Sequence, residues 1–152
     1  MCLNRLHKSF LCEQVSENIF RDCLWTLSNL ACESRVSAKL VFEEDIIKTI
    51  EVLLVNGYLT SENGMVITDV NEKENFLIGK NSFNAQMFEH MLWLIGNILG
   101  DCQEIRIEIL EKKNLLAILI LILQIYSSQF TREIWSPFNW CISNLGLAIK
   151  DV

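Results

Sequence analysis

The chain has 152 residues, of which 51% are hydrophobic and 21% are charged, and its formal net charge is −6. This length is enough for one domain with a hydrophobic core, and the apolar content excludes a globally disordered chain. The negative charge disfavours nucleic acid as a partner and favours basic partners, although such a charge can also serve solubility alone.

The longest strongly apolar run, LLAILILIL, has nine residues. A membrane-spanning helix needs about 20, so a buried helix explains this run better and no membrane association is expected. The N-terminal residues MCLNRLHKSFLC also lack the apolar core of a signal peptide.

The six cysteines form no C-x-x-C pair, and the two histidines, His7 and His90, lie far apart. We therefore expect no metal and no cofactor, and reduced cysteines suit a cytoplasmic and nuclear location. The usual motifs of hydrolases, phosphate-binding loops and metalloproteases are missing, so we do not expect an enzyme. One enzymatic alternative stays open, in which Cys12 or Cys141 acts as a nucleophile with a distant histidine.

In chain order, apolar periodicity and capping signals predict helices over residues 3–14, 16–32, 34–43, 46–55, 84–99, 102–112, 115–127 and 136–150. Ser16, Asp45 and Asn114 are the expected N-caps, and Gly100 is expected to end its helix. Pro137 is expected in the first turn of the last helix. Residues 57–82 are rich in Gly, Asn and charges and predict an inserted loop, in which MVITDV could form a hairpin strand.

One pattern occurs three times: CLWTLSNLA, MLWLIGNIL and FNWCISNLG. Each segment places Asn four residues after Trp. The second Trp-to-Trp spacing fits a three-helix repeat of about 40–47 residues, and the first is lengthened by the inserted loop. The whole chain, 1–152, is then one domain of about two and two-thirds repeats. Residues 1–33 form a partial repeat, residues 34–100 form a repeat that contains the inserted loop 57–82, and residues 101–152 form a further repeat.

Trp and Asn four residues apart share one helix face, so stacked repeats would align three such pairs. Indole faces can hold the stem and charge of Lys or Arg, and carboxamides can bind the main chain of an extended peptide. The predicted peptide-binding residues are Trp25, Asn29, Trp93, Asn97, Trp140 and Asn144. The alternative is a purely structural role, because a single Trp at helical spacing usually belongs to a core.

The segments LWTLSNLA, LWLIGNILGD and NWCISNL resemble the third helices of armadillo repeats two to four of importin alpha. The resemblance implies an all-α, right-handed armadillo-type solenoid that binds basic nuclear localisation signals as an import adaptor. It also implies that Asp101, which otherwise caps a helix, pairs with a lysine of the signal. Importin beta is an implied partner only if an N-terminal arm exists.

The chain departs from that family at Glu33, where a small residue is usual, and at the position three residues before each Trp. That position holds Asp22, His90 and Pro137. His90 could face the groove or only the surface. Because the resemblance covers three repeats, both ends of the stack should expose apolar faces and allow self-association. The alternative function is a general armadillo scaffold that binds other proteins without recognising nuclear signals.

Overall fold

The computed structural model describes residues 17–60, 64, 66, 68, 84–100, 102–112 and 114–149. Its helices are α2 (Glu17–Glu33), α3 (Arg35–Glu43), α4 (Ile46–Leu54), the π-helical turn η1 (Val55–Leu59), α6 (Ala85–Gly100), α7 (Gln103–Lys112), α8 (Leu115–Tyr126), the 3-10 turn η3 (Ser127–Gln129) and α9 (Arg132–Ile149). Within these ranges the only β pairing is an isolated bridge between Thr60 and Val66. The predicted all-α class is confirmed for this part of the chain.

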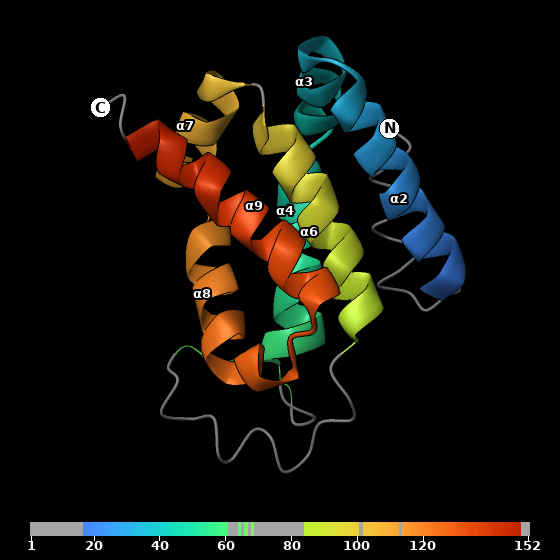
Figure 1. Cartoon of the computed structure of the whole chain (residues 1–152), viewed down its shortest axis with the longest axis vertical. Coiled ribbons are helices and arrows are strands. Elements are labelled where there is room, and N and C mark those ends of the chain that lie inside the picture. The colour runs from blue at the N-terminus through green and yellow to red at the C-terminus, as the bar shows by residue number, and fades with distance from the viewer. Residues whose placement is uncertain are drawn as a thin grey trace.

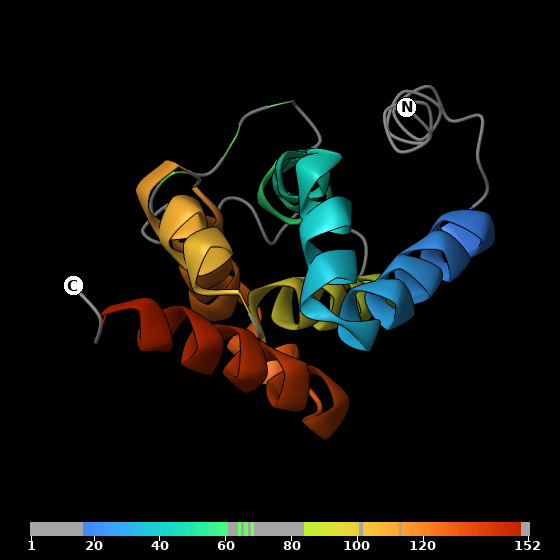
Figure 2. The ribbon, with the colours of Figure 1, turned by 90° about the horizontal axis from the view of Figure 1, so that it is seen from above.

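The three Trp-containing helices are neighbours in space although they are far apart in the sequence. Helix α6 packs between α2 and α9, and the three form a row across the front of the molecule (Figure 1). Helices α4 and α8 pack against each other behind this row, and the view from above shows α3 and α4 on the same side of it (Figure 2). The order of short helix, apolar helix and Trp helix occurs twice, as α3, α4, α6 and as α7, α8, α9.

The core lies between the row and the helices behind it. Ile46, Ile50 and Leu54 of α4 are fully buried at intervals of four residues, so they line one face of that helix. Leu115, Leu119 and Ile122 of α8 are also fully buried. The prediction of a buried helix for the apolar run of α8 is met on one face only, because Ala117 and Ile120 are exposed and Leu116, Leu121 and Leu123 are partly buried. No described helix is both long enough and apolar enough to cross a membrane.

Most helix boundaries agree with the sequence, but not all caps do. Ser34 caps α3, because its hydroxyl accepts a hydrogen bond from Ser37 N at 3.1 Å, and Asn84 caps α6 by accepting from Met87 N at 3.0 Å. Asp45 and Asn114 occupy the predicted N-cap positions of α4 and α8, but neither side chain makes a capping hydrogen bond. Asp45 instead adopts a left-handed conformation with φ 61°. Ser16 and the helix predicted at 3–14 lie outside the described residues.

The inserted loop begins later than predicted. Gly57, Tyr58 and Leu59 continue α4 as the π-helical turn. Tyr58 and Leu59 are buried, and the Tyr58 hydroxyl donates to Asn84 O at 2.8 Å. Burial of these two side chains outweighs the low helix propensity of Gly57, which decided the sequence prediction. Of the predicted hairpin, only the Thr60–Val66 bridge falls among the described residues.

Helix α9 begins four residues before its predicted start, so Pro137 is its sixth residue rather than part of its first turn. The Thr131 carbonyl accepts hydrogen bonds from Ile134 N and Trp135 N, which marks the start of the helix. A proline inside a helix costs about 3 kcal/mol or more. Ile134, Pro137 and Phe138 are buried, and this packing offsets the cost. Trp135 also belongs to this helix and lies against Phe130, with ring centroids 5.3 Å apart.

Candidate peptide-binding groove

An open groove of about 440 Å³ lies between α6 and α9. It is lined by two indoles, two amides and two hydroxyls, which belong to Trp93, Asn97, Ser136, Asn139, Trp140 and Ser143. Three of these residues, Trp93, Asn97 and Trp140, were predicted from the sequence. The structure therefore brings two of the three predicted indoles into one solvent-accessible groove.

Gly96 of α6 leaves room for the Trp140 indole to lie against that helix. A Cβ built on Gly96 would overlap the indole, because Nε1 would lie only 2.9 Å away and Cδ1 nearer still. A Cβ on Gly100 would meet Cζ2 at 3.9 Å. The indole therefore lies across α6 where two successive turns lack side chains, and it still remains 45% exposed. Trp93 is partly buried beside it.

The third indole, Trp25, is 50% exposed on α2 but has a neighbour from the protein itself. The His90 ring on α6 meets it edge-on, with centroids 5.6 Å apart. His90 Nδ1 lies 2.8 Å from Gln86 O, so it carries a proton and donates to that carbonyl. The sequence left the position of His90 open, and the structure places it between α2 and α6 beside Trp25.

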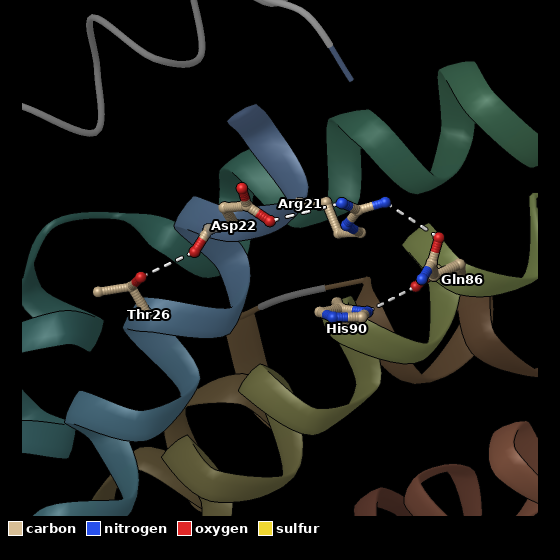
Figure 3. Close-up of polar contacts among 5 residues, drawn as sticks. All are labelled: Arg21, Asp22, Thr26, Gln86 and His90. Carbon is tan, nitrogen blue, oxygen red and sulfur yellow. Dashed lines mark hydrogen bonds and ion pairs between the residues drawn. The ribbon is translucent and has the colours of Figure 1, made fainter. Parts of the chain in front are cut away.

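A cation also lies at this end of the row. Arg21 of α2 reaches across to α6 and donates to Gln86 Oε1 at 3.1 Å (Figure 3). Its guanidinium lies 3.6 Å from the Asp22 carboxylate, which is mostly exposed and so neutralises it weakly. The surroundings of Trp25 are therefore less favourable for a second cation than the groove between Trp93 and Trp140.

The three Asn side chains do not share one open surface, as the sequence had led us to expect. Asn144 is only 3% exposed, and its Nδ2 donates to Gly96 O at 3.1 Å. Asn97 is partly buried and donates to both Ser28 O (3.1 Å) and Ser28 Oγ (3.0 Å). Of the three, only Asn29 is exposed. The carboxamides of Asn97 and Asn144 thus join neighbouring Trp helices, and a contact between Asn144 and a peptide would require a rearrangement.

Sequence reasoning missed Ser136, Asn139 and Ser143, which line the groove beside Trp140. Ser136 and Ser143 lie four residues before and three after Trp140, on the same face of α9. The helical spacing could have identified them, because all three lie within the helix predicted over residues 136–150. Asp101, the predicted counter-charge, lies outside the described residues.

The buried thiol of Cys141 has the opposite environment to that of a nucleophile. It is fully buried and donates to Leu92 O at 3.0 Å. Burial raises the pKa of this thiol, whereas reactive cysteines lie in exposed, electropositive sites that lower it. Among the described residues no group of His, Cys, Asp and Glu side chains could hold a metal ion.

The chain matches no protein-family model, and no curated protein or solved structure is similar enough to count as a match.

Proposed function

We propose that this chain is an armadillo-type helical solenoid that binds extended Lys- or Arg-rich peptides, in the manner of a nuclear import adaptor. One observation carries the proposal: Trp93 and Trp140, from neighbouring helices, line the same open groove. The order of short, apolar and Trp helices occurs twice, and the Trp helix α6 packs against both α2 and α9. This arrangement supports the solenoid, because each unit of such a fold contacts only its neighbours.

In the proposed complex, the aliphatic stem of one Lys or Arg lies between the indoles of Trp93 and Trp140. The indole faces attract the cation, by about 0.5–2 kcal/mol depending on how far it is desolvated. Asn97 Nδ2 is engaged by Ser28, so its Oδ1 is the atom available to accept from a peptide N–H. Ser136, Asn139 and Ser143 supply further polar contacts, and Asp101 supplies the counter-charge.

Trp25 and Asn29 extend this surface to α2 but hold a peptide less strongly, because the His90 ring lies against Trp25 and Arg21 lies one helical turn before it. A peptide with a single well-placed cation should therefore bind nearly as well as one with several. Such a role implies a cytoplasmic and nuclear protein whose partners are basic cargo proteins.

Anisotropy of a labelled lysine-rich peptide tests this proposal without relying on the indoles as reporters. Trp140→Ala should weaken binding by about 1–2 kcal/mol, roughly 5- to 30-fold, whereas Trp25→Ala should have a smaller effect. The control is Trp135→Phe, which alters an exposed indole outside the groove. Asp101→Lys should also weaken binding. If a peptide with norleucine in place of lysine binds equally well, the cation has no role and the proposal is wrong.

A general scaffold role is the second candidate, and it is favoured by a different surface. Val36 and Leu40 of α3 are strongly exposed, and they line an open groove of about 310 Å³ with Arg35, Lys39 and Glu43. Binding of a partner there would be abolished by Leu40→Glu and unaffected by Trp140→Ala. Binding that Trp140→Ala weakens and Leu40→Glu leaves unchanged supports the peptide groove instead.

A further inference from the structure

One side of α2 exposes apolar residues at positions that α6 and α9 bury. We compare the three helices by aligning their Trp residues. Six residues before Trp, Ile19 of α2 is 56% exposed, whereas its counterparts Met87 of α6 and Ile134 of α9 are only 5% and 1% exposed. Five residues after Trp, Leu30 of α2 is 46% exposed, whereas its counterparts Ile98 and Leu145 are buried. Ile19 and Leu30 are eleven residues apart and so lie on one stripe of α2.

The opposite side of the row shows the reverse pattern. Positions five before, one before and three after Trp are buried in α2 and α6, because each of these helices is covered by the next Trp helix. In α9 the same three positions are exposed. They are occupied by Trp135, Asn139 and Ser143, which are spaced by four residues and form one stripe.

The hydrogen bonds between Trp helices follow one rule. In α6 and α9 the Asn side chain donates to the residue three after Trp on the preceding Trp helix, as Asn97 does to Ser28 and Asn144 to Gly96. The residue after Trp follows the same direction, since Cys141 Sγ donates to Leu92 O. The side of α2 that carries Asn29 is therefore a donor side, and the exposed stripe of α9 is an acceptor side.

We infer that α2 of one copy of this chain packs against α9 of a second copy, continuing the row head to tail. Asn29 would donate to the carbonyl and hydroxyl of Ser143, which repeats the chemistry of Asn97 with Ser28. Ile19 and Leu30 would be buried against the stripe that begins with Trp135. The two contacting faces differ, so an open oligomer keeps one uncovered face of each kind and grows further unless the row closes into a ring. This inference does not depend on peptide binding.

Sedimentation of the full chain over a range of concentrations tests the contact. The wild type should show an average mass that rises with concentration. Leu30→Lys places a charge on the α2 face, and Asn139→Lys places one on the α9 face, so each variant alone should be monomeric. Gln129→Lys adds the same charge at an exposed residue of η3, outside both faces, and should associate like the wild type.

Mixing the two interface variants is the decisive step. Leu30→Lys retains an intact α9 face and Asn139→Lys an intact α2 face, so a one-to-one mixture should form a dimer and nothing larger. A monomeric mixture would overturn the inference. So would a Leu30→Lys or Asn139→Lys variant that associates alone, since that indicates a contact between identical faces. A wild type that stays monomeric at every concentration would show that another segment or partner covers α2, and would also overturn it.

Discussion

The packing of Trp140 on Gly96 gives a prediction whose magnitude follows from the structure. Replacing glycine by alanine inside a helix normally stabilises by about 0.5–1 kcal/mol. In Gly96→Ala the new methyl group overlaps the Trp140 indole. Overpacking of this kind costs about 1–3 kcal/mol, so the net change in the free energy of unfolding should lie between zero and a loss of about 2.5 kcal/mol.

Two other helical glycines serve as matched controls. A Cβ at Gly146 would have no neighbour within 4 Å, so Gly146→Ala should stabilise the protein by about 0.5–1 kcal/mol. Gly100→Ala meets Trp140 at an ordinary contact distance and should be close to neutral. Urea denaturation followed by circular dichroism measures all three. The reasoning fails if Gly96→Ala is as stable as Gly146→Ala.

Gly96→Ala should also affect the groove between α6 and α9. If the indole of Trp140 is displaced from α6, its solvent exposure rises and its position relative to Trp93 changes. Gly96→Ala should then reduce affinity for the labelled peptide while Gly146→Ala leaves it unchanged. A folded Gly96→Ala protein with wild-type affinity would separate the helix contact from the proposed binding site.

Two further predictions concern exposure and pH. In the folded protein the exposed Cys32 should react with iodoacetamide far faster than the buried Cys141, which should react only as the chain unfolds. Mass spectrometry of quenched samples measures the two rates of alkylation. Equal rates would contradict the packing of α9. Hydrogen bonds from its own backbone N–H, from Cys102 and from Arg35 lower the pKa of Glu104 to about 2. Its contribution to stability is therefore present above its ordinary pKa and is lost as the pH falls toward 2. In Arg35→Ala the Glu104 pKa, followed by NMR, should rise, and an unchanged value would exclude a role for Arg35.

The expectations that came true rest on signals within one helix. Apolar residues at intervals of three and four identify α4, α6 and α8. The Trp-x-x-x-Asn spacing likewise identifies α2, α6 and α9 as three similar helices. These are short-range relations, so spacing along the chain is enough to find them.

The expectations that failed depended on neighbours that the local sequence does not specify. Pro137 was expected to start a helix, but buried contacts around Phe138 allow α9 to begin earlier. Gly57 was expected to open a loop, but Tyr58 and Leu59 are drawn into the core as a π-helical turn. In both places long-range burial outweighed a local preference.

By itself the sequence determined that the chain is helical and that three similar Trp helices recur along it, because periodicity and spacing are properties of the chain alone. Only the tertiary structure decided what each Asn does. Asn144 of α9 is buried against α6, Asn97 joins α6 to α2, and Asn29 is exposed. The same residue at the same position has three environments because burial depends on which helix packs beside it.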